Sequence, residues 1–111
     1  MSEGRNSKRF DCDIMLNKQE AGVTNVARAT NISLSGMRIQ RVSDPSLCRQ
    51  SDVKLEVRLP GLEAPIRIQA SKVYETEDHV GVRFTRMSHR NFDRLRRWIR
   101  EKRVVNAVEN I

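Results

Sequence analysis

The stretch VGVRFTRMSHRNFDRLRRWI, residues 80–99, changes its hydrophobic period partway along. Its first five residues have the alternation of a β-strand. After Ser88, apolar residues recur at the spacing of one helix face, as Phe92, Leu95 and Ile99 do. Ser88 is also a favourable N-cap, because its hydroxyl can accept a hydrogen bond from a free N–H of the first helical turn. The stretch therefore predicts that the last strand gives way to a C-terminal helix near residue 88.

Upstream of this point, the chain is a series of short strand-like segments. VKLEVRL, residues 53–59, is the clearest, with Val53, Leu55, Val57 and Leu59 on one face and charged residues on the other. Similar patterns occur in residues 10–16, 23–33, 37–42, 66–75 and 80–84. About six short strands followed by one helix indicate a mainly β domain, either a small closed barrel or a sandwich, with the helix packed on it.

Length and composition limit the class of protein. The 111 residues suffice for one domain, and a hydrophobic content of 38% with only 5% aromatic residues predicts an aliphatic core. No apolar run reaches the ~20 residues of a membrane span. The polar, basic N-terminus does not have the apolar segment of a secretory signal, so we expect a cytoplasmic protein.

The sequence favours neither an enzyme nor a metalloprotein. It contains no nucleophile–base signature, no telling pair of carboxylates and no phosphate-binding glycine loop, so we expect no catalytic residues and no cofactor. Cys12 and Cys48 are far apart and, with only His79 and His89 as further soft ligands, cannot readily form a zinc site. We interpret the two cysteines as unpaired thiols.

Basic residues dominate the charge of the chain. Lysine and arginine number 21 against 14 acidic residues, which gives a net charge of +7 and favours an anionic partner. Many of these residues crowd the predicted helix between Arg90 and Arg103. A solvated helix face accounts for that spacing, and a surface for an acidic partner or nucleic acid is the alternative.

Two short motifs carry the functional interpretation. Arg5 and Arg9 form RxxxR in residues 1–9, which we expect to be a flexible arm, and spaced guanidiniums there suit an anion or a guanine edge. The second motif is NISLSG, with Asn31 at its start. On its own, NISLSG is typical of a strand end and a turn whose polar side chains bond to local backbone.

Taken together, RxxxR followed by [D/N]xSxxG resembles the signature of the PilZ domain family. The resemblance covers nearly the whole chain and implies a small six-stranded antiparallel β-barrel with a C-terminal α-helix, which binds the bacterial second messenger cyclic di-GMP. It divides one domain, residues 1–111, into the arm (1–9), the barrel (10–87) and the helix and tail (88–111).

The resemblance also implies the site residues. Arg5 and Arg9 would contact a phosphate and a guanine of cyclic di-GMP. Asn31 and Ser33, two apart on a strand, would share an outward face and offer acceptors to guanine N–H groups. Gly36 would allow a sharp turn or a close approach to the ligand.

Three further residues are candidate ligand contacts: Lys8, Tyr74, for which packing on the barrel is the alternative, and Arg83. Two positions depart from the commonest family pattern. Asn31 replaces the more usual Asp, and Gly4 stands where many members have another Arg before the motif. The second departure leaves open whether one or two nucleotides bind.

The expected function is that of a receptor that passes its signal to a separate, unidentified protein, in the control of motility or biofilm. One alternative is a small basic β-barrel that binds nucleic acid, although the few aromatic residues do not favour base stacking. Another is a PilZ-fold adaptor that no longer binds nucleotide.

Overall fold

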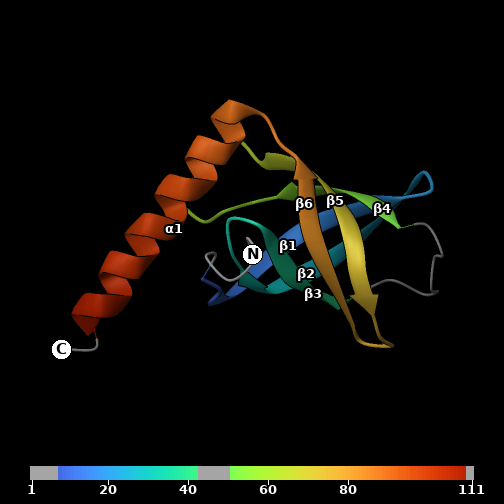
Figure 1. Ribbon diagram of the computed structural model, residues 1–111, viewed down its shortest axis with the longest axis horizontal. Helices are drawn as coiled ribbons and strands as arrows, with labels where there is room; N and C mark the ends of the chain where they lie inside the picture. Colours follow the sequence, from blue (N-terminus) through green and yellow to red (C-terminus); the bar gives the residue numbers. More distant parts are fainter. Residues whose placement is uncertain (1–7, 43–50, 110–111) are drawn as a thin grey trace, which may run out of the picture.

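The computed structural model describes residues 8–42 and 51–109, and for residues 103–109 it describes the backbone alone. Residues 1–7, including Gly4 and Arg5, and Cys48 lie outside the described part. Six antiparallel strands close into a barrel in the order β1-β2-β3-β6-β5-β4, which confirms the predicted fold class (Figure 1). The strands are β1 (Phe10–Glu20), β2 (Val23–Ile32), β3 (Gly36–Arg41), β4 (Asp52–Val57), β5 (Ile66–Glu75) and β6 (His79–Arg86).

Aliphatic side chains fill the barrel, as the alternation predicted. Val53, Leu55, Val57 and Leu59 are all at most 2% exposed. Burying a side chain of this size contributes roughly 1.5–3 kcal/mol, so the inner faces of the strands are the main source of stability. Other core residues are Ile14, Leu16, Ala27, Ala29, Ile32, Met37, Ile39, Ile66, Ile68, Ala70, Val80 and Val82.

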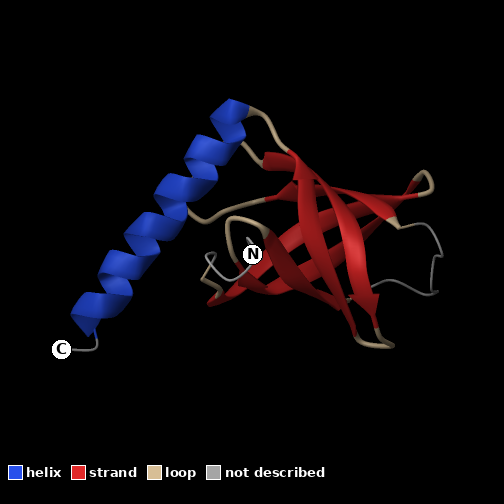
Figure 2. Ribbon diagram, in the orientation of Figure 1, coloured by secondary structure: helices blue, strands red, loops and turns tan. Residues whose placement is uncertain are grey.

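The helix α1 (His89–Glu109) begins directly after the predicted N-cap. The Ser88 hydroxyl accepts a hydrogen bond from the backbone N–H of Asn91 at 3.1 Å. Leu95, Trp98 and Ile99 form its buried face. The helix lies at one side of the barrel and runs away from the strands toward the C-terminus (Figure 2). In the described residues no helix is long and apolar enough to cross a membrane.

A β-bulge in β2 reverses which side chains point outward. The pairing of β2 with β3 shifts by one residue between Ala29 and Asn31, so Thr30 is the extra residue. Ala29 is buried in the core, and regular alternation would place Asn31 inside as well. Because of the bulge, Ile32 is buried instead and Asn31 lies on the outer face.

A second bulge has the same effect on β5. The register between β5 and β6 shifts between Lys72 and Tyr74, with Val73 as the extra residue. Tyr74 consequently points outward and is 46% exposed, while the side chain of Glu75 turns toward the interior, where it meets Lys72. This bulge therefore supplies an aromatic ring to the surface and a carboxylate to the interior.

Candidate functional site

Arg9 and Asn31 bring the two sequence motifs into contact. Arg9 immediately precedes β1, and the antiparallel register places Asp11 opposite Asn31. The Arg9 Nη1 donates a hydrogen bond to Asn31 Oδ1 at 2.9 Å. Arg9 is exposed and Asn31 half-buried, so both polar groups remain within reach of a ligand. Lys8, also exposed, adds a second positive charge next to Arg9.

The expectation that Ser33 shares the outward face of Asn31 is wrong. β2 ends at Ile32, and the Ser33 side chain that follows is fully buried. Its Oγ accepts hydrogen bonds from the backbone N–H groups of Ser35 and Gly36, both at 3.1 Å. A serine that satisfies local backbone in this way stabilises a turn. Ser33 therefore fixes the connection between β2 and β3 and presents no free acceptor on the outer surface.

Gly36 is required by the neighbouring strand. It lies opposite Arg83 in the pairing of β3 with β6. A Cβ at Gly36 would come within 2.3 Å of the backbone oxygen of Val82, a contact that no side chain can make without moving the strand. The absence of a Cβ thus allows β3 and β6 to approach each other, and its φ angle is not in the left-handed region.

A polar row crosses the outer face next to the Arg9–Asn31 contact. Asn31 pairs with Arg38 on β3, Arg38 with Gly81 on β6, and Gly81 with Tyr74 on β5. The Tyr74 ring occupies the space over Gly81, where a Cβ would lie 2.0 Å from the ring. Tyr74 therefore combines packing against the barrel with an exposed ring, directed across β6 toward Arg38.

Arg83 belongs to the same face. It is exposed on β6, two residues beyond Gly81, and so points to the same side of the sheet. Arg38 and Arg83 are diagonal neighbours on β3 and β6. Long side chains in diagonal positions can reach the same group, so both guanidiniums could contact one ligand. Guanidinium groups bind phosphate as planar forks and stack on rings, so this face suits an anion that carries flat rings.

Arg38 was not singled out from the sequence. Alternation in residues 37–42 did place it opposite the buried Met37 and Ile39. Alternation could not predict which residues neighbour Arg38, because the adjacency of β3 to β6 depends on closure of the barrel.

Cys12 is a free thiol beside this region. It is half-buried, and its Sγ donates a weak hydrogen bond to the carbonyl oxygen of Ala29 at 3.4 Å. Burial, with the nearby carboxylates of Asp11 and Asp13, raises its pKa to about 11. The thiol therefore stays protonated and unreactive near neutral pH. Among the described residues no three His, Cys, Asp or Glu side chains gather where they could hold a metal ion.

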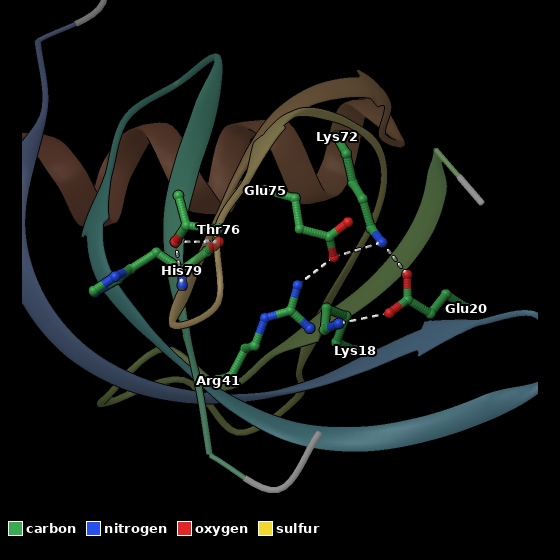
Figure 3. A network of polar contacts seen from close by, with 7 residues as sticks. All are labelled: Lys18, Glu20, Arg41, Lys72, Glu75, Thr76 and His79. Carbon is green, nitrogen blue, oxygen red and sulfur yellow. Dashed lines mark hydrogen bonds and ion pairs between the residues drawn. The ribbon is translucent and has the colours of Figure 1, made fainter. Parts of the chain in front are cut away.

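The far end of the barrel contains a charged network that the sequence did not predict (Figure 3). Glu20 forms ion pairs with Lys18 and Lys72, both at 2.7 Å. Lys72 also contacts Glu75 at 3.1 Å, and Arg41 forms an ion pair with the same carboxylate. Lys18, Glu20, Lys72 and Arg41 all have side chains less than 10% exposed.

The network shifts the pKa values of Lys72 and Glu75 toward their charged forms. Burial alone would lower the pKa of Lys72, but the carboxylates of Glu20 and Glu75 outweigh burial and raise it. Burial alone would raise the pKa of Glu75, and the hydrogen bonds from Lys72 and Arg41 hold it below its usual value. Both carboxylates of the network are thus held ionised between cations at this end of the barrel, away from the outer face described above.

Comparison with known proteins agrees with this fold. The PilZ domain of YcgR from Escherichia coli, solved with c-di-GMP, has 18% sequence identity and a TM-score of 0.70, over 96% of this chain and 98% of that one. The PilZ domain of CeSA from a cellulose-synthesizing bacterium has 17% identity and a TM-score of 0.60, over 93% and 99% of the two chains.

The Bacillus subtilis inhibitor of motility (MotI/DgrA) also has 18% identity and a TM-score of 0.70, over 92% of this chain. The chain spans about half of that protein, 52% of its length. No curated protein matches the chain significantly. At sequence identities this low, the solved structures establish the fold only. Membership of the family is established by a match to the sequence model of that family. The model for the PilZ domain matches residues 3–101, so this chain belongs to the PilZ domain family.

Proposed function

We propose that this chain is a receptor for cyclic di-GMP that has no catalytic role. The observation that carries the proposal is the hydrogen bond between Arg9 and Asn31, which joins RxxxR to NxSxxG on the outer face of the barrel. Two motifs distant in the sequence thus meet at one exposed place. The E. coli structure solved with c-di-GMP supports the choice of ligand through its fold.

In this proposal Arg5 and Arg9 bind a phosphate and a guanine of the nucleotide. Asn31 accepts a hydrogen bond from a guanine N–H, while Ser33 and Gly36 hold the β2–β3 turn that positions Asn31. Hydrogen bonds to charged groups contribute about 1.5–3 kcal/mol each.

Arg38, Arg83 and Tyr74 extend the proposed site across β3, β6 and β5. Each is exposed; Arg38 and Tyr74 both pair with Gly81, and Arg83 lies two residues further along β6. The guanidiniums of Arg38 and Arg83 would neutralise the second phosphate, and the Tyr74 ring would stack on a base. Stacking on an aromatic side chain contributes ~1–3 kcal/mol per base.

Binding would change how residues 1–9 lie on the barrel. Arg9 exchanges its bond to Asn31 for bonds to the nucleotide, and Arg5 joins it there. The arm then covers the ligand, which creates a new surface for a separate downstream protein. Control of motility is the proposed output, a choice supported by the fold shared with the B. subtilis inhibitor of motility. Control of biofilm formation is the second output that the family suggests.

Calorimetric titration with cyclic di-GMP tests the proposal. Arg9→Ala should weaken binding at least tenfold, because loss of about 1.4 kcal/mol is one decade in affinity. Arg96→Ala, which removes an exposed arginine of α1 that pairs with Asp93, should stay within twofold of the wild type. The absence of both heat and a thermal shift with the wild-type protein would contradict the receptor function and favour an adaptor that does not bind nucleotide.

A further inference from the structure

A second surface of the barrel has the features of a binding site. It is a groove of about 900 Å³ on the outer face of β1, β4 and β5, bounded on one side by residues 87–89, where α1 begins. Cavities of 300–1,000 Å³ are typical of specific ligand sites. One polar row forms much of the groove, with Gln19 paired to Lys54, Lys54 to Gln69, and Gln69 to Arg86.

The carboxylate in this groove is already engaged. Asn17 donates a hydrogen bond to Glu56 at 3.2 Å, and the Arg67 Nε lies 3.5 Å from the same carboxylate. Asn17, Glu56 and Arg67 make up the neighbouring cross-strand row. Glu56 therefore compensates the charge of Arg67 and does not neutralise the row beside it.

Lys54 and Arg86 keep their charges available to a ligand. Both side chains are exposed, and within the described part of the chain neither forms an ion pair. Gln69 lies between them in the register and Gln19 lies beyond Lys54. Each carboxamide has both donors and an acceptor, as a peptide backbone does. The groove thus offers two separated positive charges with amide groups alongside.

We propose that this groove binds a short, extended, acidic segment of a partner protein. Lys54 and Arg86 stand two strands apart, about 10 Å at the usual strand spacing. In an extended peptide, side chains two residues apart share a face and lie about 7 Å apart, and the long Lys and Arg side chains cover the difference. Two carboxylates in an acid-x-acid pattern would meet the two cations, and the carboxamides would bond to the peptide backbone.

The lining favours a peptide over a nucleic acid. None of the residues that line the groove is Trp, Tyr or Phe, so bases would find no ring on which to stack. The available cations are also only two, which matches an acid-x-acid segment better than a continuous phosphate backbone.

The groove is distinct from the proposed nucleotide face. The two surfaces share strands but no residue: on β5 and β6 the groove takes residues 67–69 and Arg86, whereas the nucleotide face takes Tyr74 and Arg83. Peptide binding therefore does not rest on cyclic di-GMP, and it is measured without the nucleotide.

Fluorescence anisotropy with a labelled hexapeptide, Glu-Ser repeated three times, tests this proposal on the full chain. We expect saturable binding by the wild type and none of the matched Gln-Ser peptide. The double variant Lys54→Gln/Arg86→Gln should bind at least tenfold more weakly. The matched double variant Arg96→Gln/Arg100→Gln, which removes two exposed charges from α1, should stay within twofold. Melting temperatures of both variants check that the fold is retained.

A charge-reversal variant tests the proposal through a gain of binding, which a variant that has merely lost folding stability could not show. Lys54→Glu/Arg86→Glu should lose the Glu-Ser peptide and gain saturable binding of a Lys-Ser hexapeptide. Equal weakening by the groove and helix variants, or no saturable binding by the wild type, would overturn the proposal. So would tighter binding of an oligothymidine strand that is lost in Lys54→Gln/Arg86→Gln, because it would identify the groove as a nucleic-acid site.

Discussion

Arg9 and Asn31 are 22 positions apart in the sequence, yet a single hydrogen bond of 2.9 Å joins them on the barrel surface. The contact depends on the bulge at Thr30, which turns the amide of Asn31 outward. The same amide is therefore the partner of the arm before binding and the proposed partner of guanine afterwards.

Asn31→Asp should bind cyclic di-GMP more tightly. The carboxylate offers two acceptor oxygens and a charge, and charge-assisted hydrogen bonds are about twice as strong as neutral ones. In the ligand-free variant the new carboxylate would also form an ion pair with Arg9, which competes with ligand binding. That pair is exposed, so it stabilises the ligand-free state by only about 0–1 kcal/mol. We expect affinity to rise by up to about tenfold in calorimetry. Unchanged or weaker binding would show that residue 31 does not face a guanine N–H.

Gly36→Ala should destabilise the barrel, because the new Cβ meets the backbone oxygen of Val82 and must push β3 from β6. Overpacking of this kind costs about 1–3 kcal/mol in the free energy of unfolding, measured by urea denaturation. Gly81→Ala is the matched comparison, since the three atoms nearest its Cβ all belong to the Tyr74 ring, a side chain that can rotate toward solvent. Equal losses in the two variants would contradict this explanation.

Glu20→Gln should be strongly destabilising. It removes one carboxylate from between Lys18 and Lys72, which leaves two buried ammonium groups with weaker partners. Breaking a buried ion pair from one side costs about 3–5 kcal/mol. Asp93→Asn, which breaks the exposed pair with Arg96, should cost under about 1 kcal/mol. Similar values for both variants in chemical denaturation would contradict the role of the network.

Acid should weaken the fold partly through Glu75. Its pKa in the folded barrel lies below the ordinary value of 4.5, so the unfolded chain takes up the proton first. The stabilisation from this carboxylate is present above pH 4.5 and is lost as the pH falls through the lower, folded-state pKa. Glu75→Gln should therefore lower the melting temperature at pH 7 and make it fall less steeply below pH 4.5. A slope equal to that of the wild type would exclude Glu75 as a source of the acid sensitivity.

The architecture was predictable because each element carries its own periodic signal. Alternation in residues 53–59 identified buried faces without reference to any neighbour, and Ser88 identified the start of the helix. Closure into a barrel came from the family resemblance, since alternation alone also allowed a sandwich.

Two of the differences from the sequence prediction concern positions where a strand is irregular or ends. Ser33 was expected on an outward face because it stands two residues after Asn31, but the strand ends between them. The approach of Glu75 to Lys72 depends on the extra residue Val73, and a shift of one residue moves a side chain to the other face. Arg38 was missed because its importance comes from neighbours on other strands.

Closure of the barrel also determines how the protein can be recognised. Each of the six described strands has a hydrogen-bonded neighbour on both sides over at least part of its length, so the sheet has no edge strand to which another chain could add. A partner that docks on the paired parts of the strands therefore contacts their side chains. Substitutions on the outer faces of the strands can then change which partner is chosen while the backbone pairing that holds the barrel together stays intact, so specificity and stability can evolve separately.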